Sequence, residues 1–215
     1  MADGAAEPKK GRKFDQVLEG ARQVFLCDGF EGASVDDIAR AAGVSKATLY
    51  SYFPDKRYLF MKVAKTECCR QADMALETID MTAPVRVVLC DVASQMVDFS
   101  TSEFGKQIFR ICIGESDRFP ELGREFYESG PAMIRDELVK YFDQAIEKGE
   151  LKIDDCKLAA DQFHQLCKAD LFLRLVLNIA ETVTQAEKQR VVDGAVDMFL
   201  ARYGATTSGT VPVTA

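Results

Sequence analysis

The sequence predicts an all-α protein of about nine helices, in which an N-terminal three-helix domain precedes a larger helical domain. Apolar residues recur with the 3.6-residue period of amphipathic helices along most of the 215 residues. No regular strand-like alternation stands out, and only six prolines interrupt the chain. Because 47% of the residues are apolar, the chain can bury a substantial core.

The N-terminus is predicted to be an unstructured arm over residues 1–11, because this stretch is small and polar. A basic tip follows it, and two interpretations of this tip stay open: a solubilising tail, or an arm that reaches DNA phosphates or the minor groove. The tip consists of Lys9, Lys10, Arg12 and Lys13. A first helix is expected over residues 12–28, and Gly29 should end it.

Residues 34–52 predict two short helices joined by a tight turn. Ser34 is a good N-cap for the first helix, and Asp37 is placed to complete a capping box. Gly43 should end that helix in a left-handed conformation, and Ser45 should cap the next helix. Two helices joined by a short turn that contains Gly form the helix-turn-helix of DNA-binding proteins.

The second helix of this pair carries side chains that suit a DNA groove. Lys46, Ala47, Thr48 and Tyr50 occupy its first turns, where a recognition helix meets base edges. Ala47 and the Thr48 methyl suit a thymine methyl, and Lys46 suits guanine. Tyrosine hydroxyls, here those of Tyr50 and Tyr52, often bind phosphates. The alternative is a helical hairpin with no role beyond packing.

This segment resembles the TetR/AcrR family of bacterial transcriptional regulators. The matching residues are Ser34, Ile38, Ala39, Ala42, Gly43, Val44, Ser45, Thr48, Leu49, Tyr50, Tyr52, Phe53, Lys56 and Leu59. The resemblance implies a homodimeric regulator that releases its operator when a small molecule binds the C-terminal domain, and it implies a phosphate contact for Lys56. The predicted DNA-binding residues are Ser34, Ser45, Lys46, Ala47, Thr48, Tyr50, Tyr52 and Lys56.

The predicted domains follow from this resemblance and from the helical pattern. The DNA-binding domain is expected at residues 12–54, the effector-binding and dimerisation domain at 55–203, and a flexible tail at 204–215. Further helices are expected over residues 54–80, 84–101, 102–117, 120–149, 155–179 and 183–203. Ser129-Gly130-Pro131 should kink or break the fourth of these six.

The last two expected helices carry more apolar surface than one chain can cover. The helix over residues 155–179 is apolar nearly all round between Leu166 and Ile179, so each of its sides must be covered. We therefore predict a homodimer through the helices at 155–179 and 183–203, and the family resemblance implies the same interface.

An effector cavity is expected among the helices of the second domain, lined mostly by apolar side chains. The predicted lining residues are Phe99, Phe104, Phe109, Cys112, Phe126, Tyr127, Met133, Phe163, His164 and Cys167. Tyr127, His164 and the thiols would supply polar groups to a hydrophobic effector of moderate size. For each residue the alternative is an ordinary place in the core, which is the commoner fate of an aromatic side chain at helical spacing.

The composition disfavours other classes of function. One histidine and seven scattered cysteines give no metal-ligand spacing, and no nucleophile–base arrangement or phosphate loop is visible, so no metal, no cofactor and no enzyme activity are predicted. No signal peptide or membrane span is found, which together with the scattered cysteines predicts a cytoplasmic protein. The net charge is −7, but residues 1–65 hold 11 basic and nine acidic residues, a balance of +2.

The predicted function is that of a sequence-specific repressor, released from a palindromic double-stranded DNA operator by a small hydrophobic molecule. Three alternatives stay open at this stage. The regulator could be an activator. The chain could be a helical ligand-binding or scaffold protein with weak DNA affinity, which the modest charge of the head favours. An enzyme is the third alternative.

Overall fold

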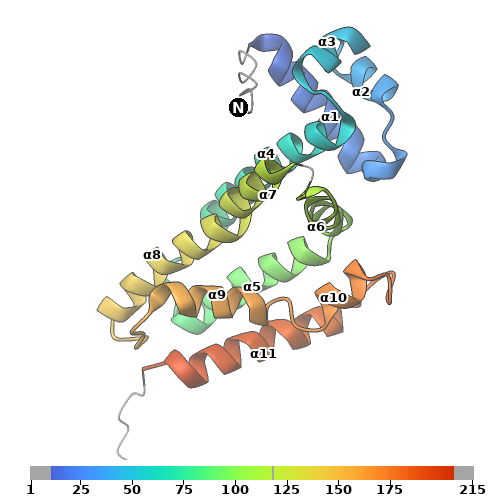
Figure 1. Cartoon of the computed structure of the whole chain (residues 1–215). Coiled ribbons are helices and arrows are strands. Elements are labelled where there is room, and N and C mark those ends of the chain that lie inside the picture. The colour runs from blue at the N-terminus through green and yellow to red at the C-terminus, as the bar shows by residue number, and fades with distance from the viewer. Residues whose placement is uncertain (1–10, 118, 206–215) are drawn as a thin grey trace, which may run out of the picture. The chain divides into compact units, whose positions relative to one another are not determined.

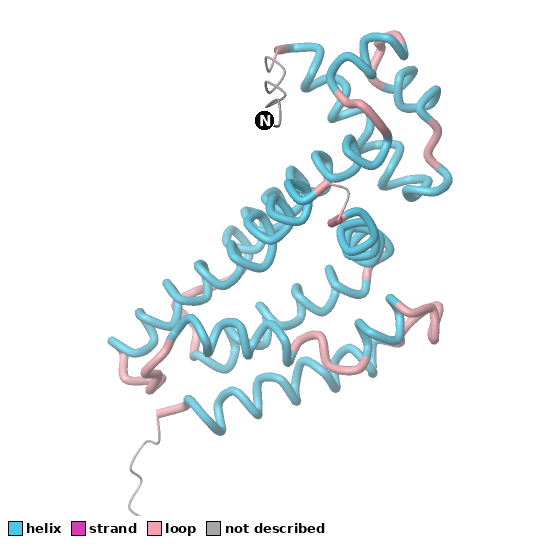
Figure 2. The backbone as a smooth tube through the Cα atoms, in the orientation of Figure 1, coloured by secondary structure: helices cyan, strands magenta, loops and turns pink. Residues whose placement is uncertain are grey.

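The computed structural model describes residues 11–117 and 119–205, except for the side chains of residues 71–76 and 122. The predicted arm, apart from Gly11, and the tail from residue 206 onward lie outside the described residues. The described residues are helical apart from turns and one isolated bridge between Leu151 and Gly204 (Figures 1 and 2). The helices are α1 (Arg12–Gly32), α2 (Val35–Ala41), α3 (Lys46–Tyr52), α4 (Lys56–Thr78), α5 (Val85–Thr101), α6 (Glu103–Glu115), α7 (Pro120–Tyr127), a π-helical turn η1 (Glu128–Ala132), α8 (Met133–Glu147), α9 (Cys156–Leu166), α10 (Leu171–Val176) and α11 (Gln185–Tyr203).

The chain forms two compact units that are not continuous in sequence. The first combines residues 1–73 with 102–130, and the second combines residues 74–101 with 131–215. Helices α6 and α7 therefore belong to the same unit as the helix-turn-helix, and α6 contacts α1. The predicted boundary between residues 54 and 55 does not coincide with the boundary between these units, because α4 runs on from the head without a break.

In the first unit, α2 lies against α1 and α3 follows α2 through the tight turn (Figure 1). The predicted left-handed Gly43 is confirmed with a φ of 63°, and Ser34 and Ser45 accept the backbone N–H of Asp37 and Thr48 as expected of N-caps. The expected capping box is wrong. The Asp37 carboxylate accepts the Ser34 hydroxyl instead of the Ser34 backbone N–H, since Asp is shorter than the usual Glu.

Helix α1 is interrupted where the sequence placed its end. Gly29 takes a φ of 69° and a ψ of 179°, which breaks the helix, and one further turn follows to Gly32. Beyond the break, the buried Phe30 ring contacts Phe25 and Phe60 at centroid distances of 6.1 and 5.2 Å. The break therefore turns Phe30 into the aromatic core that α1 shares with α4.

The second unit is built on α5 and α11, which pack along each other, and on α9, which packs against α8 and α11 (Figure 1). Its centre is aromatic: the Phe199 ring lies 5.1 Å from the rings of both Phe142 and Phe163. All three side chains are buried. Burial of each large aromatic contributes about 2–3 kcal/mol of hydrophobic free energy.

The expected interruption near Pro131 is a widening of the helix. Residues Glu128–Ala132 form a π-helical turn between α7 and α8, with Pro131 inside it. Proline has no N–H to donate to the preceding turn, so the backbone spacing must change there. The Ser129 hydroxyl donates to the Glu125 carbonyl at 2.6 Å, which satisfies one acceptor within the turn.

The prediction of one helix over residues 155–179 is wrong. Helix α9 ends at Leu166, Asp170 takes a φ of 60°, and the short α10 begins at Leu171. The sequence shows no Gly or Pro at this break. Its physical cause is tertiary, because the new direction buries Leu171 and Leu175, and α10 packs against α5.

Candidate nucleic-acid interface and effector site

The recognition helix α3 is fixed to its support by two fully buried side chains. Leu49 and Phe53 point into the core of the first unit, and the Phe53 ring stacks on Phe14 of α1 at 5.0 Å. Ser45 caps its N-terminus through the Thr48 N–H at 3.1 Å. The opposite face is left for solvent or a ligand.

On that opposite face, some of the predicted DNA-binding residues are exposed to solvent. Lys46, Ala47 and Tyr50 are exposed, with Tyr50 at 50%. The Lys46 ammonium pairs with Asp36 of α2 at 2.7 Å, and this hydrogen bond raises the pKa of Lys46. An exposed pair of this kind contributes little to stability, so Lys46 can exchange Asp36 for another anion at low cost.

Three predicted hydroxyl groups already have partners inside the head. The Ser34 hydroxyl donates to Asp37, and the Ser45 and Thr48 hydroxyls lie 2.9 Å apart within hydrogen-bond distance. Each hydroxyl keeps lone-pair capacity for a further bond. Their first task is helix capping, and DNA contacts by Ser34, Ser45 and Thr48 stay a prediction.

Tyr52 packs partly into the head. Its ring packs edge-on against Phe14 at 5.9 Å and is half-buried. Phe14 belongs to the first turn of α1, so this contact brings the exposed Arg12 and Lys13 near the end of α3. Lys9 and Lys10 of the predicted basic tip lie outside the described residues.

The structure gives Lys56 contacts that the sequence did not suggest. Its ammonium donates to the carbonyls of Phe30 and Ala33 at 2.7 and 3.0 Å and lies 4.3 Å from the centre of the Phe30 ring. These groups compete with any phosphate for the same charge. A phosphate contact by Lys56 stays a prediction, whereas its hydrogen bonds to Phe30 and Ala33 join α4 to the α1–α2 junction.

One cation near the interface was absent from the predicted set. Arg40 of α2 is exposed and pairs with Asp37 at 2.6 Å. No spacing rule singles it out in the sequence. Its position is apparent only once α2 is folded, because helical periodicity then places it away from the buried Ile38 and Ala39.

The ten predicted effector residues are divided between the two units. The first unit contains Phe104, Phe109, Cys112, Phe126 and Tyr127, and the second contains Phe99, Met133, Phe163, His164 and Cys167. Several of these side chains have partners of their own. The Phe104 ring packs on Phe60 at 5.6 Å, the Cys112 thiol lies 3.6 Å from the Met61 sulfur, and Phe163 is fully buried.

Most of the remaining predicted effector residues are less deeply packed. Phe99, Phe109, Phe126 and Met133 are half-buried, Tyr127 is exposed, and Cys167 is buried. Burial raises the pKa of the Cys112 and Cys167 thiols to about 12, so both are protonated near neutral pH. A protonated thiol is a weak nucleophile, and these residues suit packing or weak hydrogen bonding to a ligand.

His164, near the end of α9, and Lys168, in the turn that follows, form a basic pair in the second unit. His164 is only 8% exposed, and burial, followed by the nearby Lys168 charge, lowers its pKa to about 4. Burial also lowers the pKa of Lys168, whose ammonium lies 5.3 Å from the centre of the Phe172 ring. Among the described residues, no carboxylate lies within ion-pair distance of Lys168.

Lys168 was not among the predicted effector residues. The signal that could have found it is its spacing of four residues from the chain's single histidine, which places both side chains on one helical face. The sequence alone could not show that a lysine at the end of this helix is half-buried.

Two classes of site are absent from the described parts of the chain. Within residues 11–117 and 119–205, no group of three or more His, Cys, Asp or Glu side chains is arranged to hold a metal ion. None of the helices in these ranges combines the length and the apolarity that a bilayer span requires.

Comparison with known families assigns both parts of the sequence. Residues 17–63 match the bacterial regulatory proteins of the tetR family, and residues 87–205 match the C-terminal domain of AefR-like transcriptional repressors. The chain belongs to the TetR family. It combines the N-terminal domain of that family with the C-terminal domain of the AefR-like repressors.

Individual TetR-family proteins give the same result. The repressor AcnR of Corynebacterium glutamicum is 36% identical over 73 residues, which cover 34% of this chain and 39% of AcnR. The chain thus matches about two fifths of the length of this curated relative. An uncharacterised regulator of Bacillus subtilis, YezE, is 26% identical over 156 residues, which cover 70% of this chain and 80% of YezE.

Solved structures of the TetR family match nearly the whole chain. A TetR-family regulator from Mesorhizobium loti has a TM-score of 0.77 with 27% identity, and the flavonoid-responsive regulator FrrA has a TM-score of 0.66 with 35% identity. Both matches cover 92% of this chain and 100% of the other chain. The fold inferred from the sequence is therefore confirmed across both parts.

The contacts of Lys56 generate a prediction that separates a structural role from a phosphate contact. Lys56→Met should lower the free energy of unfolding by about 1–3 kcal/mol, because two buried carbonyls lose a charged donor. If Lys56 acts through these carbonyls alone, the slope of log affinity for DNA against log salt stays unchanged. Thermal melting and DNA titrations at several salt concentrations measure the two quantities.

Lys65→Met is the matched control, since Lys65 is an exposed lysine of the same helix. It should leave the unfolding free energy unchanged. A salt slope reduced by about 0.9 in Lys56→Met, at unchanged stability, would instead establish the phosphate contact.

Proposed function

We propose that the protein is a DNA-binding transcriptional repressor, which leaves a palindromic operator when a small hydrophobic molecule binds its C-terminal domain. The proposal rests on which face of α3 is buried and which is exposed. Its buried face is fixed by Leu49 and Phe53, while its exposed face offers Lys46, Ala47 and Tyr50. The similarity to AcnR, a repressor, favours repression over activation. Such a protein acts in the cytoplasm, where the bacterial chromosome lies.

In this proposal the exposed face of α3 enters the major groove. Lys46 exchanges Asp36 for a base edge or phosphate, Ala47 contacts a thymine methyl, and Tyr50 donates its hydroxyl to a phosphate. Ser34, Ser45, Thr48 and Tyr52 support this surface, and their hydroxyls accept or donate further bonds at its rim. The modest charge of the head is compensated in a dimer, because two heads bind one operator.

Selection from random duplexes tests the DNA-binding proposal and the role of Tyr50 together. The purified protein should enrich an inverted repeat whose half-sites are one helical turn, or a multiple of it, apart. Tyr50→Ala should then weaken binding of the selected operator about fivefold to a hundredfold, because it removes a contact and not a packing residue. Titration of labelled operator gives the affinities.

Tyr50→Phe separates the ring from the hydroxyl, and circular dichroism should show the same helix content in both variants. Unchanged operator affinity in Tyr50→Ala would remove α3 from the interface. A selection without any enriched sequence would favour the alternative of a helical ligand-binding or scaffold protein with weak DNA affinity.

The effector proposed here is hydrophobic and aromatic. Among the predicted residues of the second unit, the half-buried Phe99 ring and Met133 support this proposal, together with His164 and Cys167. Further support comes from FrrA, which is described as responsive to flavonoids and is 35% identical to this chain. A flavonoid has the size and the apolar faces that such rings accept.

The effector should also carry an acidic group. Lys168 is a half-buried cation without a carboxylate partner among the described residues, and the neutral His164 lies one turn before it. Withdrawing a charge from water without a partner is unfavourable, and an incoming phenolate or carboxylate would relieve that cost. The pair therefore favours flavonoid-like acids over neutral molecules of the same shape.

A matched pair of ligands tests this preference. The wild-type protein should bind a hydroxylated flavanone about tenfold to a hundredfold more tightly than its fully O-methylated analogue, because a charge-assisted hydrogen bond is lost on methylation. Lys168→Met should abolish the difference and leave binding of the analogue unchanged. Isothermal titration measures both ligands, and an undiminished preference in Lys168→Met would contradict the proposed contact.

A homodimer through the C-terminal helices completes the proposal. Leu173, Leu177 and Ile179 on and after α10 are 58–70% exposed, and Met198 of α11 is 63% exposed. Large apolar side chains that gather on two neighbouring elements usually mark an interface. The apolar run that the sequence assigned to a dimer supplies three of these four residues.

Leu177→Glu should convert the dimer into a monomer, because it places a charge among apolar side chains at the proposed interface. Sedimentation velocity at micromolar concentration measures the association state. The matched control is Ile113→Glu, since Ile113 is 62% exposed and belongs to the first unit. Dissociation by Ile113→Glu with a persistent Leu177→Glu dimer would place the interface elsewhere.

A further inference from the structure

The break in α1 leaves a backbone donor that the helix itself does not satisfy. In a continuous helix the Phe30 N–H would point to the Leu26 carbonyl, but Gly29 turns the chain away with a φ of 69°. The Phe30 N–H instead donates to Gln107 Oε1 of α6 at 2.8 Å, across 77 positions of sequence. An α6 side chain therefore fills a place that normally belongs to the α1 backbone.

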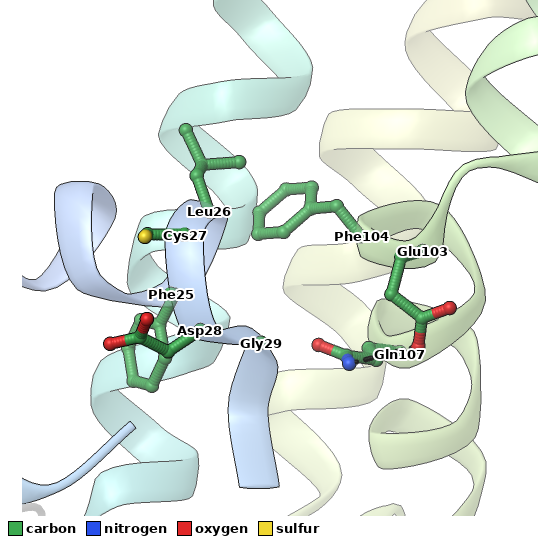
Figure 3. Close-up of a pocket in the computed structure, with 8 residues that line it drawn as sticks. All are labelled: Phe25, Leu26, Cys27, Asp28, Gly29, Glu103, Phe104 and Gln107. Carbon is green, nitrogen blue, oxygen red and sulfur yellow. Dashed lines mark hydrogen bonds between the residues drawn. The ribbon is translucent and has the colours of Figure 1, made fainter. Parts of the chain in front are cut away.

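The space at Gly29 is shaped for this contact. A Cβ atom at residue 29 would lie 2.9 Å from Gln107 Nε2, so the end of the Gln107 side chain would have to shift. Gly29 thus meets two requirements at once, a positive φ and the close approach of the Gln107 amide. Figure 3 shows the Gln107 amide directed at the backbone of Gly29.

The carbonyl side of Phe30 is bound by a residue of α4. The Phe30 carbonyl accepts the Lys56 ammonium at 2.7 Å, and the Ala33 carbonyl accepts it at 3.0 Å. Ala33 directly precedes Ser34, the N-cap of α2. The segment that leads into the helix-turn-helix is therefore fixed by α6 through one side chain and by α4 through another.

The rest of the α1–α6 junction is loosely filled. A pocket of about 370 Å³ opens between the two helices, and it is lined by Phe25, Leu26, Cys27, Asp28, Gly29, Glu103, Phe104 and Gln107 (Figure 3). Gln107 is oriented by Glu103, whose carboxylate accepts Gln107 Nε2 at 3.0 Å. Because a pocket lies beside this hydrogen bond, few other contacts at this place could hold α1 and α6 together if the bond were lost.

We propose that Gln107 is the positioning residue through which α6 sets the α1–α2 junction and thereby the orientation of the recognition helix. Helix α6 belongs to the same compact unit as the helix-turn-helix, so the position of α6 acts on the head through this bond. Gln107 itself contacts no DNA in this proposal. The inference rests on the proposed function only for the DNA part of its test.

Gln107→Met removes both hydrogen bonds and keeps the length of the side chain. The Phe30 amide should then exchange with solvent at least about tenfold faster, because its acceptor is lost. Affinity for the selected operator should fall about fivefold, as expected when one neutral hydrogen bond no longer holds the binding geometry. Hydrogen exchange resolved by residue and operator titration measure the two effects, and circular dichroism verifies the fold.

Two further variants separate positioning from general loss of stability. Gln23→Met is the matched control, because Gln23 also donates to a glutamate four residues before it, but among the described residues its side chain bonds no second helix. It should change neither quantity. The exchange Glu103→Gln with Gln107→Glu keeps an acceptor for Phe30, a donor–acceptor pair on α6 and the net charge, and should restore both quantities to within about twofold.

The outcomes are distinct. Faster Phe30 exchange with unchanged operator affinity would overturn the proposal, since the bond would then be structural only. An equal loss of affinity in Gln23→Met would overturn it as well. If the wild-type protein selects no operator, the proposed function fails. The exchange of the Phe30 amide then decides separately whether Gln107 holds the junction, and unchanged exchange in Gln107→Met would overturn that link.

Discussion

The head of this protein depends on the peptide groups of Phe30, which no helix satisfies by itself. Gly29 ends the regular part of α1, and the freed N–H and C=O of Phe30 are bound by Gln107 and Lys56. A buried backbone group without a partner costs about 1–3 kcal/mol, so these two side chains are required wherever the break occurs. The break in turn directs the chain into α2, and α2 supports α3.

The helix-turn-helix uses its polar residues first for its own structure. The hydroxyls of Ser34, Ser45 and Thr48 cap or pair within the head, and Lys46 pairs with Asp36. Such short-range bonds stabilise two seven-residue helices that would be marginal in isolation. Exposed ion pairs such as Lys46–Asp36 contribute little free energy, so Lys46 can exchange Asp36 for a DNA group without a large loss of stability. The same residues can therefore stabilise the free protein and contact DNA.

In the second unit, the residues that form the core differ from those that are available to a ligand or a partner chain. Its aromatic centre at Phe142, Phe163 and Phe199 is closed, whereas Leu173 and Leu177 are exposed and Lys168 has no carboxylate within ion-pair distance among the described residues. The cation and the apolar surface have different physical requirements. The half-buried charge favours an acidic ligand, and the exposed leucines favour a second apolar surface.

The sequence by itself determined the family, the helical class, the caps of α2 and α3 and the left-handed Gly43, because these depend on residues close together in the chain. It also located the interruptions at Gly29 and Pro131. Tertiary structure alone decided the rest. The break before Leu171 has no local signal, the grouping of α6 with the head joins residues far apart in sequence, and the bonds of Lys56 and Gln107 to Phe30 exist only after folding. Local patterns encode backbone preference, whereas long-range contacts depend on which surfaces meet.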